Sequence, residues 1–336
     1  MSKRVATGQL RTSTQLICES KWGKFAVWCD RRGFDPLTIP VARVCDYLLS
    51  LFRDEKLAPV TIEGYRSAIN SVWNVRGRSL AGSFHVEQLL KSFRAERPRS
   101  LRKFPRWDLN LVLRTLSRPP YHPVDLANPI FHSSKTVFLL LLASARRRGD
   151  IHAIDPNRVT FTRTGVVLEP TPRYLPKVLA TAEGEARYAP IVVKSLSSLT
   201  NDPDELSLCP VRALRSYDAY ARRRKPNRER FFISTRSGGN PVVKSTISSW
   251  VVRLLRRAYE NATEGDAALA ATSTHEIRAL AASLAMQATF SLTDVLSAAS
   301  WATPSTFASF YLRDVTGLQG RLHVLGPCII AGKQFQ

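Results

Sequence analysis

Hydrophobic residues in the first hundred positions recur with the period of an α-helix. After Pro40, apolar and aromatic side chains occupy positions i, i+3, i+4, i+7 and i+8, namely Val44, Tyr47, Leu48, Leu51 and Phe52. The stretch 61–70 repeats this spacing, and an aromatic-rich stretch around Trp28 indicates an earlier helix. We therefore predict a small, all-helical N-terminal domain.

A stretch rich in proline and basic residues, 96–106, interrupts this pattern and is typical of a solvated linker. We place a domain boundary near Lys103. The predicted organisation is an N-terminal domain, 1–103, a second domain, 104–316, and a C-terminal tail, 317–336.

The second domain is predicted to be mainly helical with a small antiparallel β-sheet. The stretch 136–144 is apolar on all sides, which predicts a buried helix. The stretch 159–169 alternates and turns at Gly165, which indicates a hairpin. Further predicted elements are a third strand at 189–193, a helix at 108–116 and a helix at 245–257 with Ile247, Val251 and Leu254 facing inward.

The last quarter of the chain contains a second group of helix signals. Ser273 and Glu276 have capping-box spacing, so that a helix is predicted to begin at Thr274. His275 and Arg278 then share one face near the positive helix end, where an anion is favoured. The next helix is predicted to bury Leu292, Val295, Leu296 and Ala299 and to end at Trp301.

Thr303 and Pro304 predict another helix start, and Tyr311 is placed in that helix beside Phe307 and Phe310. Each of these signals has an ordinary alternative. An HxxR pair also occurs by chance on solvated helices, and a tyrosine among phenylalanines is commonly a core residue with its hydroxyl at the surface.

Charge adds a further constraint. Lysine and arginine number 49 against 27 aspartate and glutamate residues, a formal net charge of +22. The excess is present on both sides of Lys103, with 19 basic and 9 acidic residues up to that position. Such a surplus indicates a polyanionic partner, either nucleic acid or an acidic membrane surface. Two cationic domains favour a clamp on DNA, with a merely solvated basic surface as the alternative.

Other compositional features narrow the class. Odd cysteine number and the absence of CxxC spacing predict free thiols, at Cys18, Cys29, Cys45, Cys209 and Cys328. The N-terminus lacks a signal-type apolar core, and the longest apolar run, 137–143, is far below the roughly 18 residues that span a bilayer. We expect a soluble intracellular protein without membrane association, metal or other cofactor.

Three arginines and an aspartate, Arg146, Arg147, Arg148 and Asp150, follow the predicted buried helix directly. They are either a basic helix end or a preformed anion clamp with its own acidic support. A further basic run, 222–230, is consistent with a nuclear localisation signal, a phosphate-contacting loop or a solvated loop, and we favour the last two. Arg253, Arg256 and Arg257 are placed on the outer face of a helix that could follow a DNA backbone.

Taken in order, these motifs resemble the tyrosine recombinase (phage integrase) family, most closely the recombinases of DIRS-like retrotransposons. The resemblance covers roughly 15–315. The stretch 57–69 looks like part of a core-binding domain, and 143–154 looks like the box of the first catalytic arginine. Further family-like passages are 172–178, 204–215 and 310–315. The resemblance implies a helical core-binding domain followed by an α+β catalytic domain.

The resemblance also implies a catalytic set, whose members are Arg147, Lys177, His275, Arg278, Trp301 and Tyr311. Tyr311 would attack the scissile phosphate and form a 3′-phosphotyrosine, while Arg147 and Arg278 neutralise the phosphate oxygens. Many relatives have histidine where Trp301 stands, and its separation from Tyr311 is one residue longer than in bacterial members. Because indole cannot exchange a proton near neutral pH, Trp301 is given a positioning role.

The implied function is site-specific recombination of double-stranded DNA by a tetramer on two duplexes, for integration of a mobile element, and in the nucleus if the host is eukaryotic (the cytoplasm if it is prokaryotic). Two alternatives remain open. One is relaxation of DNA by a type IB topoisomerase, which uses the same chemistry as a monomer. The other is a DNA-binding protein, catalytically inactive or domesticated from a transposon.

Overall fold

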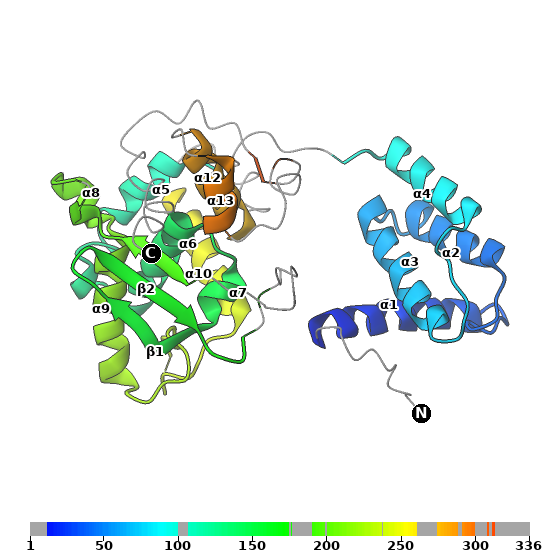
Figure 1. Cartoon of the computed structure of the whole chain (residues 1–336), viewed down its shortest axis with the longest axis horizontal. Helices are drawn as coiled ribbons and strands as arrows, with labels where there is room; N and C mark the ends of the chain where they lie inside the picture. Colours follow the sequence, from blue (N-terminus) through cyan, green and yellow to red (C-terminus); the bar gives the residue numbers. More distant parts are fainter. Residues whose placement is uncertain are drawn as a thin grey trace. The chain divides into compact units, whose positions relative to one another are not determined.

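The computed structural model describes residues 12–99, 107–174, 176, 190–198, 200–236, 238–260, 274–287, 291–299, 308 and 311–312. The chain divides into two compact units, residues 1–100 and 101–336 (Figure 1). The division after Ser100 lies close to the boundary expected near Lys103.

The described part of the first unit consists of four helices, α1 (Thr12–Asp30), α2 (Val41–Arg53), α3 (Pro59–Asn74) and α4 (Phe84–Glu96). Pro59 occupies the first position of α3, where a missing N–H removes no helical hydrogen bond. α1 packs against α3, and α2 packs against α3 and α4. The stripe expected after Pro40 is confirmed, because its side chains are all buried: Val44, Tyr47, Leu48, Leu51 and Phe52.

Two arginines support this bundle by stacking on aromatic rings. The guanidinium carbon of Arg78 lies 4.0 Å from the centre of the Trp73 ring, and its Nη2 donates to the carbonyl oxygen of Ile39 at 2.9 Å. The guanidinium carbon of Arg97 lies 3.5 Å from the centre of the Phe52 ring and the group also donates to the carbonyl of Phe52. The expectation of a solvated linker is therefore wrong at Arg97, which the helical bundle holds in place.

The second unit contains a three-stranded sheet and helices on its sides (Figure 1). Its described elements are α5 (Leu109–Leu116), η1 (Val124–Leu126), α6 (Pro129–Ser144), α7 (Arg148–His152), β1 (Ile154–Phe161), β2 (Gly165–Pro170), β3 (Ile191–Lys194), η2 (Leu196–Ser198), α8 (Pro203–Ser207), α9 (Pro210–Arg224), α10 (Lys244–Ala258), α12 (Thr274–Gln287) and α13 (Leu292–Ala298).

Helix α6 is the central element of this unit, and it packs against α9, α10 and α12. Every side chain from His132 to Ser144 is buried, which confirms the prediction of a buried helix. The buried residues of α6 include a lysine, Lys135, whose side chain is 0% exposed. The Lys135 ammonium donates to the carbonyl oxygens of Leu116 at 2.8 Å and Tyr121 at 3.4 Å, which ties the end of α5 to α6.

The sheet is antiparallel with strand order β1-β2-β3. The predicted hairpin is confirmed, but its turn lies at residues 162–164, and Gly165 begins β2. A Cβ atom at Gly165 would lie 2.5 Å from the carbonyl oxygen of Val193 on β3. The absence of a side chain at Gly165 therefore allows β2 and β3 to lie close together. The prediction that Gly165 forms the turn is wrong. The third strand forms as expected, shifted to Ile191–Lys194.

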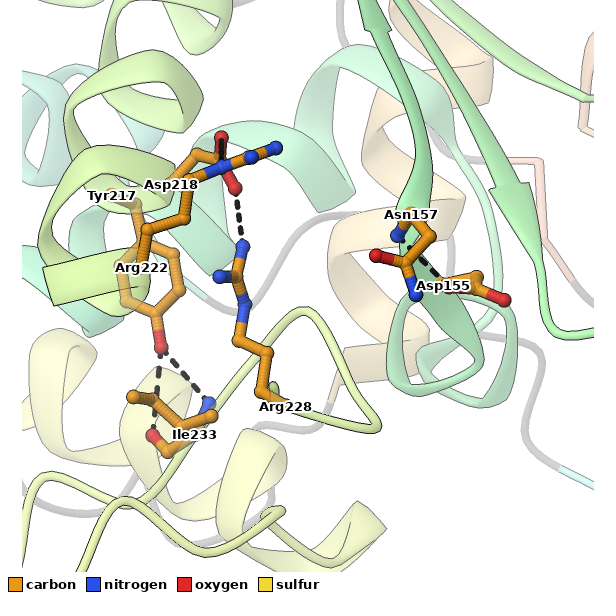
Figure 2. A network of polar contacts seen from close by, with 7 residues as sticks. All are labelled: Asp155, Asn157, Tyr217, Asp218, Arg222, Arg228 and Ile233. Carbon is orange, nitrogen blue, oxygen red and sulfur yellow. Dashed lines mark hydrogen bonds and ion pairs between the residues drawn. The ribbon is translucent and has the colours of Figure 1, made fainter. Parts of the chain in front are cut away.

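A buried ion pair joins α9 to the segment that follows it (Figure 2). Arg228, whose side chain is 2% exposed, pairs with Asp218, and Arg222 binds the other carboxylate oxygen of Asp218 at 2.8 Å. The Tyr217 hydroxyl accepts a hydrogen bond from the Ile233 N–H at 3.1 Å. The expectation that 222–230 is a solvated or DNA-contacting loop is therefore wrong at Arg228, because Asp218 draws that guanidinium into the core.

Candidate active site

Three successive arginines follow α6, and their side chains differ in burial and in the groups that they contact. α6 ends at Ser144, and Ala145 adopts a left-handed conformation with φ of 48°. The Arg146 guanidinium, in a residue 3% exposed, donates to the carbonyl oxygen of Pro190 at 3.2 Å. The Arg148 guanidinium donates to the Ser248 hydroxyl of α10. Arg147 stands between them, half-buried, and immediately precedes α7.

The carboxylate of Asp150 holds the start of α7 in place. Its Oδ2 accepts a hydrogen bond from the backbone N–H of Arg147 at 3.0 Å, and its Oδ1 accepts one from the Tyr174 hydroxyl at 2.7 Å. Asp150 is 1% exposed. A buried carboxylate with two donors fixes both of them, so that the backbone from which Arg147 projects has a defined position.

Helix α12 begins at Thr274, as predicted, and carries two candidate residues. Arg278 is 1% exposed, whereas His275 in the first turn is exposed. The Nη2 of Arg278 donates to the carbonyl oxygen of Ala299 at 2.7 Å, which joins α12 to the residue after α13. The helix thus places Arg278 in the interior and His275 at the surface one turn earlier.

The buried position of Arg278 has an electrostatic consequence. Burial, together with the nearby positive charges of Arg147 and Arg146, lowers the pKa of its guanidinium to about 9. Tyr311 and Asp150 oppose this lowering of the Arg278 pKa. Three arginines from two distant segments therefore concentrate positive charge around Arg278. This charge would favour the binding of an anion there.

Tyr311 lies against the same arginine. The guanidinium carbon of Arg278 is 5.6 Å from the centre of the Tyr311 ring, within the range of a cation–π contact. The carbonyl oxygen of Tyr311 accepts a hydrogen bond from the Ser283 hydroxyl of α12 at 3.4 Å. Tyr311 itself is in a turn, so its placement in a helix is wrong. Its carbonyl is bound by a side chain of α12, as is common for backbone groups outside a helix.

The structure brings together Arg147, Arg278 and Tyr311, which are far apart in sequence. Lys177 and Trp301 lie outside the described residues, as do Ser273 and the Phe307 and Phe310 expected beside Tyr311. In the predicted stripe of α13, Val295, Leu296 and Ala299 are buried, but Leu292 is 37% exposed. Leu292 is the first residue of α13, where the side chain does not reach the core.

Tyr174 is a site neighbour that the sequence did not single out. It follows β2 and reaches back to Asp150, and the motif around 172–178 drew attention only to its lysine. An aspartate that follows a buried helix closely, as Asp150 does, requires hydrogen-bond donors when it is buried, which is the signal that could have suggested a partner.

In the described parts of the chain, no group of three histidine, cysteine, aspartate or glutamate side chains could hold a metal ion. Among the helices described, none is long and apolar enough to cross a membrane. The described cysteines are free thiols, namely Cys18, Cys29, Cys45 and Cys209.

Comparison with known proteins gives a consistent picture at the level of fold. No family model matches the chain, and no curated protein does. Among solved structures, a lambda integrase (75–356) dimer bound to a COC′ core site is similar, with a TM-score of 0.55, 15% identity, and coverage of 94% of this chain and 93% of the other.

Two further structures agree. A lambda integrase tetramer bound to a Holliday junction has a TM-score of 0.53 at 16% identity, covering 94% of this chain and 76% of the other. XerH site-specific recombinase in a post-cleavage complex with a palindromic difH substrate has a TM-score of 0.51 at 12% identity, covering 91% and 86%. The mostly helical chain with its small antiparallel sheet thus has the fold of the tyrosine recombinases, as the resemblance predicted.

Proposed function

We propose that this protein is a site-specific DNA recombinase that cleaves and rejoins DNA through a 3′-phosphotyrosine on Tyr311. The observation that carries the proposal is the meeting of Arg147, Arg278 and Tyr311, from three separate segments, within a fold shared with lambda integrase and XerH. A net charge of +22 supports DNA as the partner.

The chemistry requires a nucleophile and neutralisation of phosphate charge. The Tyr311 oxygen attacks the scissile phosphorus, the bond from phosphorus to the 5′ oxygen breaks, and the 5′ oxygen leaves as a hydroxyl after gaining a proton. Arg278 and Arg147 neutralise the non-bridging oxygens as charge develops. A buried guanidinium with a lowered pKa gains most from an anionic phosphate, because desolvated charges attract each other strongly.

Three further roles come from the family resemblance. Lys177 donates the proton to the leaving 5′ oxygen, and His275 acts as general base or acid towards Tyr311 and the phosphate. The exposed position of His275 in the first turn of α12 leaves it accessible to DNA. Trp301 positions the nucleophile through packing and an indole N–H.

The unit assignments follow the same resemblance. Residues 1–103 form the core-binding domain, 104–316 the catalytic domain, and 317–336 the C-terminal tail. The active assembly is a homo-tetramer on two DNA sites, and it serves a mobile element of the DIRS-like type. It works in the nucleus if the host is eukaryotic and in the cytoplasm if the host is prokaryotic.

Covalent capture from a mixed pool of DNA tests the reaction without the choice of a particular site. The protein is incubated with nicked duplexes of random sequence, in which the short 5′-hydroxyl fragment diffuses away after cleavage. Adducts that survive denaturing detergent are then isolated, and their DNA is sequenced. The proposal expects adducts at a shared sequence, with the peptide containing Tyr311 as the DNA-linked peptide in mass spectrometry.

The matched control is Tyr311→Phe, which keeps the ring beside Arg278 and removes the nucleophile. Adducts formed by this variant would exclude the mechanism. Binding of DNA by wild type without any adduct supports the binding-only alternative. Relaxation of supercoiled plasmid by a monomer, without exchange between two captured sites, supports the topoisomerase alternative.

A further inference from the structure

The segment that follows β2 is fastened to the rest of the second unit at both of its ends. The N–H of Thr171 donates to the carbonyl oxygen of Ala153 at 2.9 Å, and its hydroxyl accepts from Arg230 at 3.0 Å. The N–H of Tyr174 donates to the carbonyl oxygen of Thr171 at 2.9 Å, which closes a turn. Tyr174 is thereby presented to α7 from a defined backbone.

The Tyr174 hydroxyl meets the carboxylate that also holds the backbone of Arg147. It donates to Asp150 Oδ1 at 2.7 Å, while the N–H of Arg147 donates to Oδ2 at 3.0 Å. Since Asp150 is 1% exposed, these donors replace water around the carboxylate. Loss of the phenol would leave one oxygen of a buried charge without this donor and free the carboxylate to rotate.

Gly149 makes this approach possible. A Cβ atom at position 149 would lie 3.1 Å from the Tyr174 hydroxyl, a contact closer than side chains normally accept. The absence of a side chain there lets the phenol reach Asp150. The glycine at position 149 and the tyrosine at position 174 are therefore both needed for the hydrogen bond to Asp150.

We propose that Tyr174 is a positioning residue for the cleavage reaction, acting on Arg147 through Asp150. This inference rests on the proposed function, in which Arg147 neutralises a non-bridging oxygen of the scissile phosphate. Tyr174 itself does not touch the DNA. Its hydroxyl fixes the carboxylate that fixes the backbone of Arg147, so that the guanidinium projects towards the phosphate from one position only.

The test compares wild type and Tyr174→Phe on the captured DNA site, in single-turnover cleavage at saturating protein. The variant keeps the ring and loses only the hydroxyl. We expect the cleavage rate to fall about tenfold, the lower end of the effect known for lost outer hydrogen-bond partners at metal centres. The apparent Kd for DNA should stay unchanged, because Tyr174 is not a DNA contact.

A chemically altered substrate separates positioning of Arg147 from a general loss of structure. A methylphosphonate at the scissile position replaces one charged non-bridging oxygen with a methyl group, so less charge needs neutralising. We expect the ratio of wild-type to Tyr174→Phe rates to fall towards one on this substrate. An equal ratio on both substrates would overturn the proposal.

A second substrate tests the competing route through the leaving group. With sulfur in place of the 5′ bridging oxygen, the leaving group is a thiolate, which is far less basic than an alkoxide and needs no proton donor. The defect of Tyr174→Phe should persist on this substrate. Its disappearance would mean that Tyr174 acts on proton donation, which would overturn the proposal.

Two further variants complete the test. Tyr217→Phe also removes a buried hydroxyl, one that binds the backbone of Ile233 away from this segment, and its rate ratio should be the same on every substrate. Tyr174→Phe added to Arg147→Ala should produce no additional loss, because the two residues act in series. If wild type forms adducts and Tyr174→Phe cleaves as fast as wild type, this inference is refuted while the proposed function stands. If wild type forms no adduct, the proposed function itself is refuted.

Discussion

The guanidinium of Arg278 in α12 faces the ring of Tyr311 at 5.6 Å, although the two residues are 33 positions apart and Tyr311 lies in a turn. The contact joins a buried cation to an aromatic ring that carries a phenolic hydroxyl. In the proposed reaction the same cation stabilises the phosphate that this hydroxyl attacks. The contact therefore places the proposed nucleophile, Tyr311, beside the group that would neutralise the charge of the phosphate.

Replacing Arg278 with methionine separates its catalytic and structural effects. We expect Arg278→Met to abolish adduct formation, because Arg278 places a positive charge at the ring of Tyr311 and methionine removes that charge. Stability should be unchanged or raised, since a desolvated guanidinium is replaced by an apolar chain of similar length. Covalent capture and urea unfolding measure the two effects.

The informative control is Arg278→Lys, which keeps a positive charge and loses the planar fork. It should cleave more slowly than wild type, because an ammonium cannot bind two phosphate oxygens side by side. Adduct formation by Arg278→Met at the wild-type rate would remove Arg278 from the site.

The buried Lys135 predicts how stability depends on pH. Burial lowers the pKa of its ammonium to about 7, with a smaller contribution from the charge of Arg212. The unfolded chain keeps this proton up to a pH of about 10.5, so between these values it binds more protons than the folded chain. Stability from this residue must therefore rise as pH increases from about 7 towards 10.5.

Lys135→Met removes this dependence. We expect the stability of wild type relative to Lys135→Met to increase steadily over that pH range, as measured by urea unfolding at each pH. Lys225→Met, at an exposed lysine beyond the end of α9, is the control and should leave the dependence unchanged. A constant difference between wild type and Lys135→Met would show that Lys135 keeps its proton on folding.

Gly165 predicts a local defect in the sheet. In Gly165→Ala the new Cβ would meet the carbonyl oxygen of Val193 at 2.5 Å, and a backbone atom cannot move aside without shifting β3. We expect destabilisation of about 1–3 kcal/mol, as for overpacking of a core. Hydrogen exchange should accelerate in β2 and β3 first.

Gly23→Ala in α1 is the matched control, because nothing lies within 4 Å of its added Cβ. This change should stabilise α1 by up to about 1 kcal/mol, the difference in helix propensity. A Gly165→Ala protein as stable as wild type would show that β3 can move away from β2.

The buried pair of Asp218 and Arg228 predicts strong coupling between the two residues. Among the described residues, Arg228→Met leaves the largely buried carboxylate of Asp218 paired with Arg222, and we expect a loss of about 3–5 kcal/mol in unfolding free energy. Adding Asp218→Asn should recover much of that loss, because the uncompensated charge is then removed. Additive effects in urea unfolding would argue that the pair is not coupled.

Much of the fold could be predicted because its signals are local. The stripe of α2, the buried run of α6 and the alternating hairpin each depend on neighbouring residues, and all are confirmed. The errors fall at residues whose environment comes from elsewhere in the chain. Arg97 and Arg228 are predicted as solvated charges, but an aromatic ring or a carboxylate of another segment binds them.

The candidate site shows the same division. Sequence motifs pointed to Arg147, Arg278 and Tyr311 by residue type and spacing, and the structure places them in one region. The assignment of Tyr311 to a helix is wrong, and no sequence pattern indicates a role for Tyr174. Its hydrogen bond with Asp150 joins positions 24 apart in sequence, and no periodic pattern encodes such a contact.

By itself, the sequence determined the helical bundle, the central buried helix, the antiparallel sheet and the strongly basic character of the chain, because periodicity and charge are properties of short segments. Only the tertiary structure decided which arginines are buried, which carboxylates hold them, and that Tyr311 lies against Arg278. The reason is that burial, and with it the lowered pKa of Arg278, depends on atoms that distant segments bring together.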